Sequence, residues 1–184
     1  MKKLLTVLAI ATVVSFSASA QKGEHPSPAG NSSPALSVGF EAGLSTGDLS
    51  TTQKAGFGAS VKYAQPVMEG GAVTVSVGYM SFAGKSFLGI KVPAWNAVPA
   101  KVGFRYTIKG SGFNIEPQIG YTFGSVSGSS SKDASGFTWA IGAGYFFTPN
   151  IDLGIRYEST SVTGASLNFV GLRIAYNFNL GGKK

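Results

Sequence analysis

The sequence contains no cysteine. Disulfide bonds, thiolate nucleophiles, cysteine-held metals and a lipid-modified amino-terminal cysteine are therefore excluded. Histidine occurs once, at His25 near the amino terminus, so the chain after residue 25 lacks the usual proton acceptor near neutral pH. We therefore expect no catalytic, metal-binding or cofactor-binding residues, and no enzymatic activity. A lysine–serine or paired-carboxylate arrangement is the remaining route to catalysis.

Charge is also scarce. Charged residues make up 12% of the 184-residue chain, against roughly 25% in soluble domains. Long apolar runs are missing as well, because no run beyond the first twenty residues approaches the roughly 18 residues of a membrane-spanning helix. A membrane location would therefore require strands. The formal charge of +7 is not gathered into a basic stripe with aromatic residues, so no nucleic-acid partner is expected.

The amino terminus carries an export signal. Lys2 and Lys3 precede an apolar core from Leu4 to Val14, and the small residues Ala18-Ser19-Ala20 follow. This pattern predicts a signal peptide over residues 1–20 with cleavage after Ala20. Residues 21–35 are polar and rich in proline, and predict a disordered periplasmic lead-in.

Alternation with a period of two dominates the remaining chain. In residues 136–157, Phe137, Trp139 and Ile141 alternate with small or polar residues, and after 148–150 the alternation resumes. Successive side chains of a strand point to opposite faces, so this pattern predicts a hairpin of two strands. The same pattern predicts eight strands in all, over 36–45, 54–64, 72–82, 97–108, 113–123, 137–147, 151–158 and 167–180.

The predicted connections differ in length. Residues 66–71, 109–112 and 148–150 are short turns, and residues 46–53, 83–96 and 124–135 are longer loops, with a short loop near 161–166. Short periplasmic turns and longer external loops are typical of outer-membrane barrels. Pro117 removes a donor from the fifth strand, so we expect a β-bulge there.

The two faces of the strands differ in polarity. One face carries large apolar residues on nearly every strand, and the other mixes small residues with nine charged ones, Glu41, Lys62, Lys101, Arg105, Glu116, Asp152, Arg156, Glu158 and Arg173. Five basic and four acidic residues nearly cancel, as a buried network of ion pairs in a narrow lumen requires. A soluble lipocalin-like barrel, with these charges in water, is the alternative.

Aromatic residues gather near the strand ends. One group would lie at the periplasmic end, at Tyr63, Tyr106, Phe113, Phe147, Tyr176 and Phe178. The other would lie at the outer end, at Tyr79, Tyr121, Phe123, Phe137, Trp139 and Tyr157. Two such girdles are expected where aromatic rings meet lipid headgroups.

These features resemble the small eight-stranded outer-membrane barrels of the OmpA/OmpX type over residues 36–180. The last strand, GLRIAYNFNL, is similar to their carboxy-terminal insertion signal, with Tyr176 and Phe178 at alternating positions. Residues 181–184 form a polar tail in place of a terminal aromatic residue. The resemblance implies an antiparallel up-and-down transmembrane β-barrel, inserted by the barrel-insertion machinery, and we expect no peptidoglycan-binding domain after it.

The function expected from this fold is structural. We expect an outer-membrane barrel that supports membrane integrity and binds through its loops, with outer-membrane lipids and lipopolysaccharide as partners. Loop or rim lysines that could contact lipopolysaccharide phosphates are Lys54, Lys85, Lys91 and Lys132. The alternatives are a narrow channel for small solutes and a soluble periplasmic binding barrel. Phe87 and Trp95 are either a contact patch or anchors of their loop.

Overall fold

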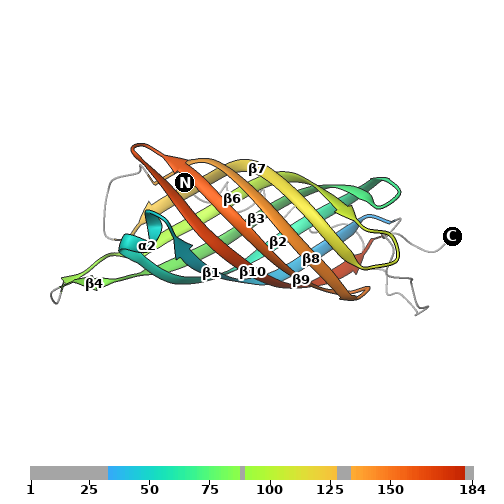
Figure 1. Ribbon diagram of the computed structural model, residues 1–184, viewed down its shortest axis with the longest axis horizontal. Coiled ribbons are helices and arrows are strands. Elements are labelled where there is room, and N and C mark those ends of the chain that lie inside the picture. Colours follow the sequence, from blue (N-terminus) through green and yellow to red (C-terminus); the bar gives the residue numbers. More distant parts are fainter. Residues whose placement is uncertain (1–32, 88–89, 128–133, 181–184) are drawn as a thin grey trace, which may run out of the picture.

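Eight antiparallel strands close into a single barrel (Figure 1). The computed structural model describes residues 33–87, 90–127 and 134–180. Going round the barrel the order is β1-β10-β9-β8-β7-β6-β3-β2, and β1 pairs with β10 to complete the closure. The barrel strands are β1 (Ala35–Thr46), β2 (Gln53–Met68), β3 (Gly71–Gly84), β6 (Trp95–Thr107), β7 (Phe113–Val126), β8 (Gly136–Thr148), β9 (Ile151–Val162) and β10 (Ala165–Asn179). The predicted eight-stranded up-and-down barrel is confirmed.

The two ends of the barrel are built differently. The end at the left of Figure 1, called the loop end below, carries helix α2 (Leu49–Thr52) and the small hairpin of β4 (Ser86–Phe87) and β5 (Ile90–Lys91). The opposite end, the turn end, has the short connections 69–70, 108–112 and 149–150. Within the described ranges, no helix is long and apolar enough to cross a bilayer.

Several connections are tighter than the sequence suggested. The barrel strands run for 12 to 16 residues. The turn expected at 66–71 is shortened to 69–70, because β2 continues through Pro66 to Met68 past a register shift that tolerates the missing proline donor. The loop expected near 161–166 is the two-residue turn 163–164, where Gly164 adopts a positive φ of 81°.

The bulge expected at Pro117 is absent. Pro117 pairs with Ile141 of β8 in an unbroken register, and the register between β6 and β7 is the same before and after the proline. The ladder between β6 and β7 simply omits Phe104 and Arg105, which lie opposite this stretch. The missing donor is thus accommodated by a local gap in pairing, without an inserted residue.

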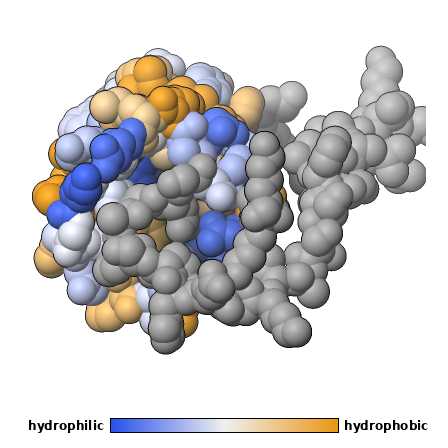
Figure 2. Space-filling model, turned by 90° about the vertical axis from the view of Figure 1, so that its right-hand side faces the viewer, coloured by the Kyte–Doolittle hydropathy of each residue, from blue (hydrophilic) through white to orange (hydrophobic). Residues whose placement is uncertain are grey.

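Polarity is inverted relative to a soluble protein. Large apolar side chains face outward on every strand, with Phe40 77% and Ile119 56% exposed, while charged and hydroxyl side chains face the lumen. From the turn end, hydrophobic groups occur in patches around the circumference and hydrophilic groups at the mouth of the lumen (Figure 2). An outward apolar surface of this extent requires lipid, so the soluble alternative does not fit.

The predicted aromatic groups lie on this outward surface. All twelve of these residues are exposed, from 36% for Tyr157 to 62% for Phe147. Neighbouring rings touch at both ends, with centroids 4.8 Å apart for Tyr176 and Phe178 and 5.6 Å apart for Trp139 and Tyr157. The rings are thus placed to meet the two interfaces of a bilayer.

Candidate functional site

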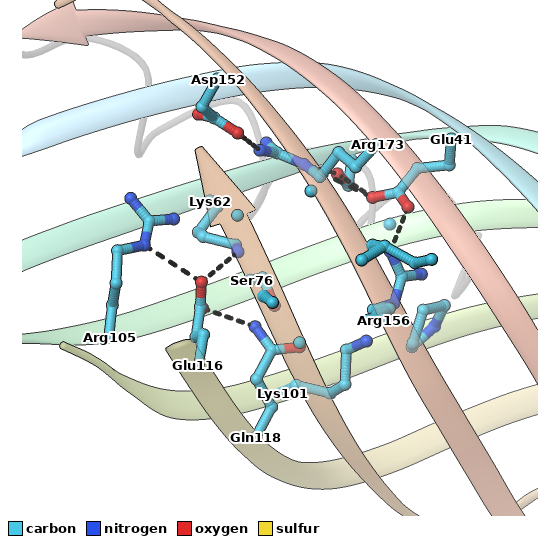
Figure 3. Close-up of a pocket in the computed structure, with 18 of the residues that line it drawn as sticks. Glu41, Lys62, Ser76, Lys101, Arg105, Glu116, Gln118, Asp152, Arg156 and Arg173 are labelled. Carbon is cyan, nitrogen blue, oxygen red and sulfur yellow. Dashed lines mark hydrogen bonds and ion pairs between the residues drawn. The ribbon is translucent and has the colours of Figure 1, made fainter. Parts of the chain in front are cut away.

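All nine predicted lumen charges lie inside the barrel, and Figure 3 shows eight of them with their neighbours. Strand alternation places them there, because each occupies an inward position of its strand. None of the nine side chains is more than 12% exposed. The lumen therefore contains charges that must be paired with one another.

Glu116 of β7 is the centre of one cluster. Its Oε2 accepts hydrogen bonds from Lys62 Nζ at 2.8 Å and from Arg105 Nε at 3.1 Å. Its Oε1 accepts from Thr74 Oγ1 at 2.8 Å and from Gln118 Nε2 at 2.7 Å. Four donors satisfy this buried carboxylate, and the two cations leave the cluster one positive charge in excess.

Arg156 of β9 is the centre of a second cluster. It bridges two acids, with Nη1 paired to Glu41 Oε2 and Nε 2.8 Å from Glu158 Oε2. Lys101 reaches across the lumen from β6 to the same Glu158 oxygen. The guanidinium carbon also lies 5.5 Å from the centre of the Phe169 ring. Arg156 thus links β9 to β1 and β10, and Glu158 links β9 across the lumen to β6.

Arg173 of β10 extends the second cluster towards the turn end. Its Nε lies 3.5 Å from Glu41 Oε1 and its Nη1 lies 3.3 Å from Asp152 Oδ1. Its remaining donor reaches Ser37 Oγ at 2.9 Å, and Asn177 Nδ2 donates to Asp152 at 2.6 Å. With three cations and three carboxylates, the second cluster is electrically neutral.

Little space is left between these groups. The cavity they line has a volume of about 60 Å³, and a water needs roughly 10–15 Å³ of such space. A methyl group added at Gly171 would lie 3.3 Å from Arg156 Cζ, so this glycine provides the room that the guanidinium occupies. The space left between the two clusters would suit a few waters.

An apolar plug lies in the lumen on the loop-end side of the two charged clusters, which together are called the charged layers below. It comprises Leu49, Met80, Phe82, Trp95, Ala97 and Phe169, each at most 3% exposed. Phe82 is its centre, with ring centroids 5.3 Å from Trp95 and 5.1 Å from Phe169. Leu49 of α2 caps the group, so the short helix serves to close the mouth of the barrel.

A ring of hydroxyl groups lies on the remaining wall at this level. Thr122, Thr138 and Thr160, from β7, β8 and β9, are buried, and their Oγ1 atoms lie 2.6 Å and 2.9 Å apart in succession. Each hydroxyl satisfies its neighbour. The loop end of the lumen is therefore closed by packed side chains with few charges.

The plug is the feature that sequence reasoning missed. Trp95 was expected in a loop, as a contact patch or an anchor, whereas it begins β6 and is buried against Phe82. The signal was present, because Phe82 continues the inward series of Ser76, Gly78 and Met80 at a spacing of two. Extending the alternation by one step would have placed it inside.

Of the predicted lipopolysaccharide contacts, Lys54 and Lys85 lie on neighbouring segments at the loop end, next to the paired residues Gln53 and Gly84. Lys54 is exposed on β2, and Lys85 is half-buried with its Nζ donating to the carbonyl oxygen of Ser50. Lys91 lies in β5, and Lys132 lies outside the described residues. The predicted signal peptide, most of the lead-in and the polar tail also lie outside the described residues.

Metal and cofactor ligands were not expected. Across residues 33–87, 90–127 and 134–180, no group of three or more histidine, cysteine, aspartate or glutamate side chains could hold a metal ion. The four lumen carboxylates are all engaged in ion pairs. These carboxylates therefore bind cationic side chains of the barrel itself.

Comparison with known proteins gives a family match. A family model described as outer membrane protein beta-barrel domain matches residues 8–178. None of the curated proteins matches the sequence.

Several solved structures share the fold. Ail, the attachment invasion locus protein of Yersinia pestis, is 15% identical with a TM-score of 0.60, and the match covers 80% of this chain and 100% of Ail. The amino-terminal β-barrel domain of OprF from Pseudomonas aeruginosa is 15% identical with a TM-score of 0.55, covering 78% and 97%. OprG from the same species is 12% identical with a TM-score of 0.51, covering 84% and 100%. At these identities the likeness concerns the fold.

Proposed function

Because the chain belongs to the outer membrane protein β-barrel domain family, we propose that it is a non-conducting barrel that supports the bacterial outer membrane and binds partners at its loop end. The observation that carries this proposal is the filled lumen. Two different barriers lie in series along the barrel axis, the paired charges and the apolar plug around Phe82. A solute would have to displace both.

The barriers oppose permeation for different reasons. An ion entering the charged layers would have to separate buried ion pairs, and breaking one such pair costs about 3–5 kcal/mol. Water at the plug would have to enter a close-packed group whose central ring, Phe82, is fully buried. An eight-stranded barrel is only just wide enough for its own side chains.

A narrow channel is the second candidate. The polar cavity of about 60 Å³ between Glu41, Lys62 and Arg173 is the observation that favours it. Its size suits a few waters, and it would need a path through the plug to conduct. We rank it below the non-conducting barrel for that reason.

We further propose that the protein is not an enzyme. Each of the four carboxylates in the lumen is engaged in an ion pair with a lysine or arginine, which leaves none free to act as a general acid or base. The loop end of the described chain carries no histidine or cysteine. Lipids and the barrel-insertion machinery are the partners that fit, the latter through Tyr176 and Phe178 at the turn end of β10.

Planar-bilayer conductance tests the proposal. We expect the wild-type barrel to show no unitary steps, while a boiled-versus-unboiled gel shift verifies that it is folded. Phe82→Ala removes the centre of the plug, and Phe147→Ala removes a ring of similar size from the lipid-facing surface, where it is 62% exposed. Reproducible wild-type steps that grow with Phe82→Ala but not with Phe147→Ala would establish the channel and overturn the proposal.

A further inference from the structure

An open groove runs along the outside of the barrel at the loop end. It is lined by residues of β2, β3 and the segment before β6, including Ala55, Phe57, Ser81, Ala83 and Pro93, and has a volume of about 580 Å³. Apart from Ser81 and Ser127, its lining residues are nonpolar. The volume falls within the roughly 300–1,000 Å³ of small-molecule sites.

The wall of the groove is fixed by hydrogen bonds to main-chain carbonyl groups. The segment 92–94 is tied to its neighbours, because Val92 N donates to the carbonyl oxygen of Lys85, just after β3, at 2.8 Å, and Gln53 Nε2 of β2 donates to that of Pro93 at 3.2 Å. Ser127 N donates to the carbonyl oxygen of Ala94 at 2.9 Å. A groove held in this way is formed before any ligand binds, which lowers the entropic cost of binding.

The groove lies at the level of lipid headgroups. Tyr79, a member of the outer aromatic girdle, is 50% exposed and immediately precedes Ser81 on the outward face of β3. Tyrosine and tryptophan mark the boundary between hydrocarbon and headgroups. The groove therefore begins where acyl chains meet their headgroups and continues towards the loop end.

Basic residues flank the groove. Lys54 precedes Ala55, and Lys85 follows Gly84, and both neighbours line the groove. Lys54 is exposed and, among the described residues, no carboxylate pairs with it. No lining residue is acidic. The surface thus combines an apolar groove with a positive charge at its edge, and a phosphorylated lipid has the complementary apolar chain and negative charge.

We propose that this groove binds one phosphorylated lipid of the outer leaflet, with the upper part of an acyl chain against Phe57 and Ala83 and a phosphate at Lys54. The inference rests on the outer-membrane location and is independent of whether the lumen conducts. A conductance result that overturns the proposed function would therefore leave the lipid-binding proposal intact, and a negative lipid-binding result would leave the proposed function intact.

Native mass spectrometry of the full barrel in detergent tests the proposal. The probes are lipid A, an acylated bis-phosphorylated disaccharide, its dephosphorylated form, and inorganic phosphate. We expect one lipid A bound tightly, weaker binding of the dephosphorylated form, and no displacement by inorganic phosphate. Lys54→Glu should weaken lipid A binding roughly thirtyfold, because it replaces an attractive charge beside the phosphate with a repulsive one. The same variant should leave the dephosphorylated form unaffected.

Filling the groove provides the second arm. Ala83→Phe should weaken binding of both lipids roughly tenfold by occupying the space. Ser161→Phe, at an exposed position at the loop end of β9, is the matched control and should bind as wild type. Equal binding of the two lipids by the wild type, displacement by inorganic phosphate, or unchanged binding by Ala83→Phe would each overturn the proposal.

Discussion

The two halves of the lumen are filled by opposite means. Towards the turn end, charged side chains from β1, β2, β6, β7, β9 and β10 fill the space and satisfy one another. Towards the loop end, Phe82, Trp95 and Phe169 pack as in the core of a soluble protein. The first way of filling the lumen depends on charge balance and the second on shape.

This difference predicts different tolerance to substitution. A buried charge that loses its partner is left uncompensated in a medium of low polarity, and no repacking can restore it. An apolar group can be exchanged for another of similar volume at less than about 1.5 kcal/mol. The plug should therefore accept changes of residue type that the charged layers reject.

Arg156→Leu should have the largest effect. It leaves the neutral second cluster with one excess negative charge shared by Glu41 and Glu158, and we expect a loss of about 3–5 kcal/mol in the free energy of unfolding. Urea unfolding in lipid vesicles, followed by the boiled-versus-unboiled gel shift, measures this loss.

Arg105→Leu is the matched control within the lumen. It removes the excess cation of the first cluster and leaves Glu116 bonded to Lys62, Thr74 and Gln118. We expect it to cost clearly less than Arg156→Leu. Equal losses would mean that charge balance within each cluster does not govern stability.

Gly56→Ala tests the plug and should have an intermediate effect. The added methyl would lie 2.5 Å from Phe82 Cδ1, so the ring must shift, at a cost of about 1–3 kcal/mol. Phe82→Leu should cost about 1 kcal/mol alone and should relieve part of the Gly56→Ala penalty in the double variant.

Gly154→Ala is the control that separates steric crowding at Gly56 from the effect of replacing any strand glycine by alanine. Its added methyl would meet only the carbonyl oxygen of Ala143, at an ordinary 3.6 Å. Its free energy of unfolding should match the wild type. If Gly56→Ala is equally neutral, or if the double variant with Phe82→Leu is merely additive, Phe82 is not close-packed against β2.

The barrel itself could be predicted because its signal is local. Alternation in single strands identifies which side chains face lipid, and the eight strands and nine lumen charges follow from counting. The strand ends were less predictable. Pro66 lies within β2 and Pro117 pairs without a bulge, because neighbouring strands absorb the missing donors in ways that single-strand patterns do not contain.

The partners within the lumen could not be predicted. Lys101 pairs with Glu158 from a strand on the far side of the lumen, and such a contact depends on register around the whole barrel. The apolar plug was not predicted for a different reason. An apolar residue at an inward position, such as Phe82, conflicts with the rule of a polar lumen, and only the loop-end contacts with Leu49 and Trp95 explain it.

The smallest effect on stability is expected for an ion pair outside the lumen, where both side chains are exposed to water. Lys109 Nζ lies 2.6 Å from Glu69 Oε1 between two turns, and both side chains are about four-fifths exposed. The hydrogen bond from Lys109 lowers the pKa of Glu69 below its usual value, so any stabilisation is present above the ordinary carboxyl pKa and is lost as pH falls through the lowered one. Solvent screening should make this contribution negligible. Glu69→Gln should therefore unfold like the wild type at neutral and acidic pH, and a difference that persisted in about 1 M salt would show that desolvation is not what distinguishes the lumen pairs from this one.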